Sequence, residues 1–209
     1  MSKAIYQLEL GNSNVSGFKM WKDLGAEEAQ RLDAARVTAF KAVGGEVILS
    51  QNSAFADSMH RWWSISRFPS LQDCISFTHA AYKTGYLDVS DQFTLLGTME
   101  DEVKKVDLAN PIYCLWIIKN TVASAQSIHQ AGGSAALAWE EHNQLYQDNH
   151  SQIILYCSSY WANQAYQGFG VSVFPDIDAL MRVSDGLEKL GWPKYFDAVT
   201  YLGIPWSEE

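Results

Sequence analysis

Two titratable side chains stand in the middle of helical stripes that are otherwise mainly apolar. A helix is predicted at about residues 26–43. Its inward face would carry residues at spacings of three and four, namely Ala29, Leu32, Arg36, Phe40 and Val43. A second helix, predicted at about residues 134–149, repeats the stripe with Ala135, Ala138, His142 and Tyr146. Burying a polar group without a partner costs roughly 2–7 kcal/mol. We therefore take Arg36, His142 and Tyr146 as candidate catalytic residues.

The chemistry that these residues offer is proton transfer and polarisation. A histidine with a pKa near neutral can act as a general base on an acidic C–H or a phenol, and Tyr146, one turn after His142, can donate a hydrogen bond. The alternative is that Arg36 and His142 are boundary residues whose polar ends reach solvent. Both interpretations stay open at the level of the sequence.

Five further residues are candidates for substrate binding. Arg67, on a predicted strand, could hold a carboxylate or an enolate-like oxygen together with Arg36. Trp63 and Trp116 would shape a cavity, and His79 lies at the edge of an apolar helical stripe. Asn14 follows the first strand, where a turn also favours an Asx-type hydrogen bond. No group of residues has the spacing of a metal site, so we predict none.

An internal repeat positions these residues. Shifting the chain by 106 residues aligns residues 65–98 with 171–204 without a gap. Nine of these 34 positions are identical, among them Phe68-Pro69 with Phe174-Pro175 and Gly85 with Gly191. The same shift places Arg36 on His142, and Arg67 on Val173. The chain is therefore a tandem duplication in which the two copies differ at candidate site positions.

Each copy predicts the element order β-α-β-β-α-β. Strands are expected at about 6–10, 46–51, 62–68 and 93–98, and again at 112–118, 152–157, 168–174 and 199–204. The Phe-Pro step would end the third strand and open the second helix, with the proline in its first turn, and Gly85 or Gly191 would end that helix. This order is the ferredoxin-like split βαβ unit. We predict an α+β fold with an N-terminal repeat at 1–105, a linker, and a C-terminal repeat at 111–209.

Two such units in one chain, with Phe-Pro after the third strand and Leu-Gly at the last, resemble the dimeric α+β barrel superfamily. The resemblance implies an intramolecular, pseudo-dimeric barrel with ligands held between sheet and helices. Members include cofactor-independent monooxygenases, polyketide cyclases, muconolactone isomerase, haem-degrading enzymes and the haem-binding chlorite dismutase group. The haem-degrading members use an Asn, a Trp and a His, for which Asn14, Trp63 and His79 are the nearest equivalents here.

Composition limits the partners. The net charge is −9 and no Lys/Arg-rich run occurs, which argues against nucleic acid and anionic membrane surfaces. Eight Trp, ten Tyr and nine Phe favour a small apolar or aromatic ligand. The apolar runs are too short to cross a bilayer, the N-terminus has no signal-like segment, and the three cysteines are widely spaced. We expect a cytoplasmic protein that is a monomer or a homodimer.

These observations favour a small-molecule enzyme without a cofactor. It would be a monooxygenase, isomerase or cyclase acting on an aromatic or polyketide-like metabolite in a pocket between sheet and helices. Two alternatives are a non-catalytic ligand-binding or accessory protein, and a haem-binding protein that uses His142 or His79.

Overall fold

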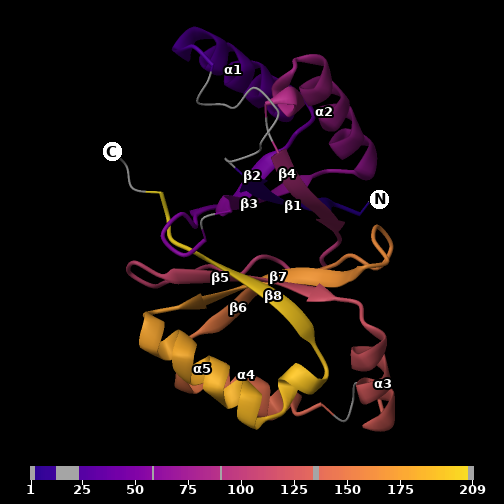
Figure 1. The fold of residues 1–209 in the computed structure, drawn as a ribbon, viewed down its shortest axis with the longest axis vertical. Helices are drawn as coiled ribbons and strands as arrows, with labels where there is room; N and C mark the ends of the chain where they lie inside the picture. Colours follow the sequence, from indigo (N-terminus) through magenta and orange to yellow (C-terminus); the bar gives the residue numbers. More distant parts are fainter. Residues whose placement is uncertain (1–2, 13–23, 58, 90, 134–136, 207–209) are drawn as a thin grey trace. The chain divides into compact units, whose positions relative to one another are not determined.

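The computed structural model describes residues 3–12, 24–57, 59–89, 91–133 and 137–206. The chain divides into two compact units. Unit 1 comprises residues 1–98 and 206–209, and unit 2 comprises residues 99–205. Each unit has one four-stranded antiparallel sheet and helices on one face of that sheet (Figure 1). The predicted α+β class with two ferredoxin-like repeats is confirmed.

Unit 1 follows the predicted element order, with one short addition. Its strands are β1 (Ile5–Asn12), β2 (Glu46–Asn52), β3 (His60–Phe68) and β4 (Asp91–Gly97). Helix α1 (Ala26–Ala42) connects β1 to β2, and α2 (Leu71–Lys83) with the 3-10 turn η2 (Tyr86–Asp88) connects β3 to β4. The strands are ordered β2-β3-β1-β4, as the ferredoxin-like topology requires.

Unit 2 repeats this arrangement with a further helix. Its strands are β5 (Ile112–Lys119), β6 (Gln152–Ser158), β7 (Tyr166–Phe174) and β8 (Asp197–Gly203), in the order β6-β7-β5-β8. Helices α3 (Val122–Gln130) and α4 (Trp139–Asp148) lie between β5 and β6. Helix α5 (Ile177–Lys189) and the 3-10 turn η4 (Trp192–Lys194) precede β8. The expected helix at 134–149 is shorter, and α3 was not predicted.

The sheet register refines the repeat. Tyr6 pairs with Gly97 and Tyr113 pairs with Gly203, so the first strands correspond at a shift of 107 residues, while the other strands keep 106. Glu9 of β1 therefore corresponds to Trp116 of β5. The predicted match of Asn14 to Asn120 involves Asn14, which lies outside the described residues.

The second helices do not begin at proline. Ser70 is the N-cap of α2 and its hydroxyl accepts a hydrogen bond from the backbone N–H of Asp73 at 3.2 Å; Asp176 caps α5 in the same way. Pro69 thus precedes the cap, and the prediction that it opens the first turn is wrong. Glycine at the other end was placed correctly: Gly85 and Gly191 follow the helices with φ of 81° and 76°, a conformation that favours glycine.

The helix-facing side of each sheet carries the core of its unit. In unit 1, Phe40 of α1 and Phe77 of α2 pack on Ile5 and Phe68. In unit 2, Tyr146 of α4 and Val183 of α5 pack with Phe174. Since side chains alternate along a strand, this fixes which residues face the helices: Ile5, Gln7 and Glu9 on β1, and the corresponding set on β5, Ile112, Cys114 and Trp116.

The segment expected as a linker is held by unit 2. The backbone N–H of Lys104 donates to the carbonyl of Ile154 at 3.0 Å, and Gln152 donates to the carbonyl of Lys105 at 3.0 Å. The chain end returns to unit 1, where the indole N–H of Trp206 donates to the hydroxyl of Ser50 at 3.1 Å. Among the described helices none is long and apolar enough to cross a membrane.

Candidate functional site

His142 lies at the centre of a group of aromatic rings in unit 2. Its ring centroid is 4.2 Å from that of Trp192, 5.0 Å from that of Tyr146 and 5.9 Å from that of Trp139. Trp192 in turn stacks on Phe196 at 5.0 Å. All five histidines of the sequence belong to the described residues, and only His142, 5% exposed, is buried. The prediction of an inward-facing histidine on this helix therefore holds for its position.

Burial sets the protonation state of His142. Loss of solvent lowers the pKa of the imidazole from its ordinary value of 6.5, and a hydrogen bond with Asn143 opposes this shift. Nδ1 lies 3.4 Å from Oδ1 of Asn143. When Nδ1 carries the proton it donates to this oxygen, which leaves the lone pair of Nε2 available. His142 is thus a neutral imidazole at pH 7, suited to accept a proton or to bind a metal.

Ser172 links the other two candidates of unit 2. Its hydroxyl oxygen accepts a hydrogen bond from the indole N–H of Trp116 at 3.1 Å and lies 3.3 Å from the hydroxyl of Tyr146. Burial raises the pKa of Tyr146 to about 12, so its phenol keeps the proton at neutral pH. Tyr146 and Trp116 therefore meet on the helix-facing side of the unit 2 sheet, and His142 lies one turn before Tyr146 on α4, 5.0 Å from its ring.

The indole of Trp116 has a fixed place because β7 has a glycine beneath it. A Cβ on Gly170 would overlap the six-membered ring of Trp116. Tyr156 stacks on the same indole at 5.8 Å, with an interplanar angle of 18°. The helix-facing side of the sheet beside His142 is thus lined by aromatic rings and one serine.

Arg36 lies at the matching place in unit 1. It donates to Oδ1 of Asp33 from Nη2 at 2.9 Å and from Nε at 3.2 Å. Its guanidinium is 5.4 Å from the ring centre of Tyr86, a cation–π arrangement. With 30% of its side chain exposed, Arg36 is a half-buried residue rather than a core one.

The structure does not bring Trp63 and Arg67 together with Arg36. Both point to the sheet face opposite to the helices, because Phe68, the next residue of β3, packs under α1 and α2. Trp63 is fully buried, while Arg67 is partly exposed and lies 3.7 Å from Glu46. His79 is exposed on α2, and Asn14 lies outside the described residues.

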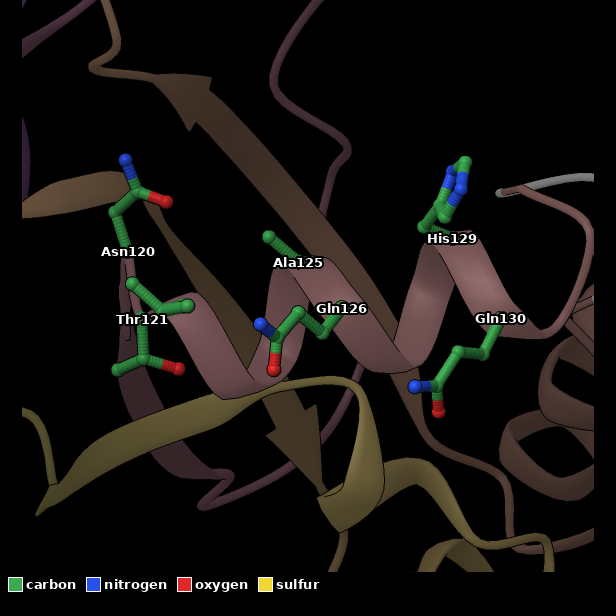
Figure 2. A pocket seen from close by; sticks show the side chains of 7 residues that line it. Asn120, Thr121, Ala125, Gln126, His129 and Gln130 are labelled. Atoms are coloured by element: carbon green, nitrogen blue, oxygen red, sulfur yellow. The ribbon is translucent and has the colours of Figure 1, made fainter.

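An open groove of about 570 Å³ follows helix α3. Figure 2 shows Asn120 and Thr121 at the start of this helix and His129 and Gln130 at its end, with Asn120, Ala125 and His129 directed to one side. The lining residues carry no charge apart from the titratable His129, which is exposed. The groove lacks the buried polar groups that surround His142. Across the described residues no three His, Cys, Asp or Glu side chains are placed to share a metal ion.

Comparison with known proteins identifies the fold. No family model matches the chain, and no curated protein matches it either. Solved chlorite dismutases are similar to it over nearly its whole length. A variant of the enzyme from Candidatus Nitrospira defluvii in complex with cyanide is 13% identical, with a TM-score of 0.71, and the match covers 97% of this chain and 90% of that one.

Two further structures agree. Chlorite dismutase from the same organism in complex with imidazole is 14% identical, with 96% and 90% of the two chains covered and a TM-score of 0.68. A provisionally assigned chlorite dismutase is 12% identical, with 99% and 96% covered and a TM-score of 0.67. At these identities the similarity shows the fold. The predicted likeness to the dimeric α+β barrel superfamily is confirmed at that level.

This finding corrects two predictions. Chlorite dismutases are the haem-binding group of the superfamily, so the expected cofactor-independent monooxygenase, isomerase or cyclase for an aromatic metabolite is wrong. The prediction that no cofactor is needed is contradicted in the same way. The sequence favoured the cofactor-independent members of the superfamily, whereas the solved structures that this chain resembles are chlorite dismutases.

Sequence reasoning missed three residues on the helix-facing sides of the two units, Ser172 and Trp192 in unit 2 and Glu9 in unit 1. Ser172 is one of the identical positions of the repeat, paired with Ser66, and this identity was a usable signal. Trp192 follows Gly191, the residue that ends the helix, and nothing in the sequence at this position indicates a contact with His142. Glu9 was passed over because it occupies one polar position in an alternating strand, which is the ordinary pattern of a solvent-facing residue.

Proposed function

We propose that this chain is a haem-binding protein and that His142 would hold the haem iron. The observation that carries the proposal is the placement of His142: a buried imidazole whose Nδ1 lies 3.4 Å from the amide oxygen of Asn143. Ligating histidines need a free nitrogen lone pair and a hydrogen bond from the other nitrogen that holds the ring. Imidazole is also a common axial ligand of haem iron.

The surroundings of His142 fit a porphyrin in their chemistry. The ring of Trp192 lies 4.2 Å from the imidazole, and the lone pair of Nε2, which lies in the plane of that imidazole, would hold the iron. Trp139 and Trp192 supply aromatic surface on one side, and Tyr146 supplies a neutral phenol that can donate a hydrogen bond. Apolar and aromatic linings with few polar groups are typical of cofactor sites.

The related structures support the same cofactor. Chlorite dismutase from Candidatus Nitrospira defluvii has been solved with imidazole, and a variant of it with cyanide. Both small molecules are strong ligands of haem iron. Bound haem would supply an iron centre that coordinates such ligands and changes oxidation state. His142 would hold it, and the buried rings around His142 would exclude water from the iron.

The test is a haem titration of the purified protein, followed by its Soret absorption. We expect saturable binding of one haem per chain, and loss of the shifted Soret band in His142→Ala. His79→Ala is the matched control, because His79 is the other histidine considered and is exposed on α2 in unit 1. Added imidazole should restore the band in His142→Gly. An unchanged spectrum in His142→Ala, or no binding by the natural protein, would contradict the proposal.

The remaining candidate residues keep their predicted roles as proposals. Tyr146 and Trp116 are proposed to line the site in unit 2, because both face the helices there and meet at Ser172. Arg36, which corresponds to His142, belongs to unit 1 and is considered below.

A further inference from the structure

Unit 1 has polar side chains at the place where unit 2 has its aromatic rings. On the helix-facing side of its sheet, the pair Ile5–Phe68 is followed by Gln7–Ser66 and then by Glu9–Ser64. Gln7, Ser66 and Ser64 are at most 8% exposed. Glu9 is half-buried, and it is the charged residue of this row.

These side chains form a connected network that ends at Glu9. The thiol of Cys74 donates to Oε1 of Gln7 at 3.4 Å, and Nε2 of Gln7 donates to Oε1 of Glu9 at 3.0 Å. The hydroxyl of Ser64 also hydrogen-bonds to Glu9. Burial raises the pKa of this carboxyl, while the positive charge of Arg36 acts in the opposite direction.

Arg36 lies on α1 one turn before Phe40, which packs on the Ile5–Phe68 pair at one end of this row. Its Nε and Nη2 donate to Asp33, one turn earlier on α1, and its guanidinium lies over Tyr86. Its charge nevertheless reaches Glu9. Among the described residues, the hydrogen bonds of the Arg36 guanidinium go to Asp33, and those of the Glu9 carboxyl come from Gln7 and Ser64.

Unit 2 shows that the fold does not require this arrangement. At the corresponding level Glu9 is replaced by Trp116, Ser64 by Gly170 and Arg36 by His142. There the row is filled by an indole stacked on Tyr156. Burying a carboxyl is costly compared with packing an aromatic ring. A half-buried carboxyl that the scaffold can do without marks a functional site.

We propose that Glu9 and Arg36 form a second small-molecule site, in unit 1, for a planar uncharged molecule with an N–H or O–H donor beside a carbonyl acceptor, such as a cyclic amide. The donor hydrogen-bonds to the carboxylate of Glu9 and the carbonyl accepts from the guanidinium of Arg36. Trp62, whose half-buried indole lies across Gly11 on the same sheet face, provides a flat apolar surface next to Glu9. The site is independent of haem binding in unit 2.

The experiment uses a matched pair of probes in calorimetric titrations of the full chain. 2-Pyridone has an N–H next to a carbonyl, and N-methyl-2-pyridone lacks the N–H. We expect 2-pyridone to bind and the methylated probe to bind about tenfold more weakly or worse, because a site built to hydrogen-bond a donor rejects the analogue without it. No binding of 2-pyridone, or equal affinity for the two probes, would overturn the proposal.

Variants locate the binding. Glu9→Leu and Arg36→Met should each weaken 2-pyridone at least tenfold, and Glu9→Gln, which keeps the shape, should weaken it less. Arg31→Met is the control for Arg36→Met, because Arg31 makes the same kind of ion pair with Glu28 on the exposed side of α1. If Glu9→Leu and Glu9→Gln bind 2-pyridone with unchanged affinity, the assignment of the site to Glu9 is wrong. The haem spectrum should be the same in all of these variants. A negative result for 2-pyridone binding can therefore be distinguished from a negative result for haem binding.

Discussion

Replacing Gly170 by alanine tests whether the packing of Trp116 organises unit 2. The new Cβ would overlap the indole of Trp116 and lie 2.8 Å from the backbone oxygen of Leu155. The indole has little freedom to withdraw, because its N–H donates to Ser172 at 3.1 Å and Tyr156 stacks on it. Either the ring or the strand must move.

The expected cost follows from these contacts. Inserting one carbon into a packed core costs about 1–3 kcal/mol, and losing a hydrogen bond such as that to Ser172 adds about 0.5–1.5 kcal/mol. Alanine recovers about 0.5–1 kcal/mol, because glycine is entropically unfavourable in a strand. We expect a net loss of about 1–3 kcal/mol in the free energy of unfolding, or a Tm lower by about 4–20 °C for a domain of this size.

The assay is urea unfolding, followed by tryptophan fluorescence, of Gly170→Ala, Trp116→Leu and the double variant. If the indole is the obstacle, removing it relieves the overlap, and the double variant is more stable by about 1 kcal/mol or more than the sum of the single effects predicts. Strict additivity of the two substitutions would refute this reasoning, as would a Gly170→Ala protein as stable as the natural one.

Four further predictions concern burial and charge. The free energy of unfolding should fall as pH drops below about 6.5, because the unfolded chain takes up a proton that buried His142 resists, and His142→Asn should remove that part of the pH dependence in thermal melts. The pKa of the Glu9 carboxyl is raised in the folded protein, so Glu9 contributes stability at low pH that is lost as pH rises. Glu9→Gln should therefore increase the free energy of unfolding at pH 8 relative to that at pH 4. The same pH profile in the variant and the natural protein would contradict this prediction. Phe68→Ala should cost about 3–5 kcal/mol in denaturant unfolding, because this ring contacts Phe40 and Phe77 within 6 Å of centroid separation, whereas exposed Phe55→Ala should cost little. Tyr146→Phe should remove the tyrosine that titrates at about 12 in absorbance, at a cost near 1 kcal/mol.

The scaffold was predictable because its signals are local and occur twice. Phe68 and Phe174 end the third strands and enter the cores, and Gly85 and Gly191 adopt the left-handed conformation that ends the helices. Helix α3 was missed although a capping signal was present: the hydroxyl of Thr121 accepts from the backbone N–H of Ser124 at 3.1 Å. The repeat pattern drew attention to a single helix between the first two strands, and this outweighed the local signal.

The composition of the site was less predictable because both faces of β3 are buried. Trp63 and Ile65 on one face, and Ser64 and Ser66 on the other, are all at most 8% exposed. Alternation alone cannot say which set faces the helices, so Trp63 and Arg67 were grouped with Arg36 although they lie on the opposite face. Contacts such as that between His142 and Trp192 join residues 50 positions apart, and no spacing rule in the sequence encodes them.

The duplication explains how such different sites arise on one scaffold. In both units the first cross-strand pair on the helix-facing side packs under an aromatic ring of the first or corresponding helix. Ile5 and Phe68 pack under Phe40, and Ile112 and Phe174 pack under Tyr146. Arg36 and His142 lie one helical turn before Phe40 and Tyr146. The residues at this level can differ between the units, because the neighbouring core contacts already hold each helix to its sheet. Unit 1 has placed a carboxyl and a guanidinium there, and unit 2 an imidazole among aromatic rings. Exchanging Arg36 for histidine should therefore leave unit 1 folded without giving it the chemistry of unit 2, since unit 1 has Glu9 at the strand position that Trp116 occupies in unit 2. A charged partner raises a histidine pKa and burial among rings lowers it. The row beneath each helix, rather than the helical residue alone, thus decides the chemistry of each unit.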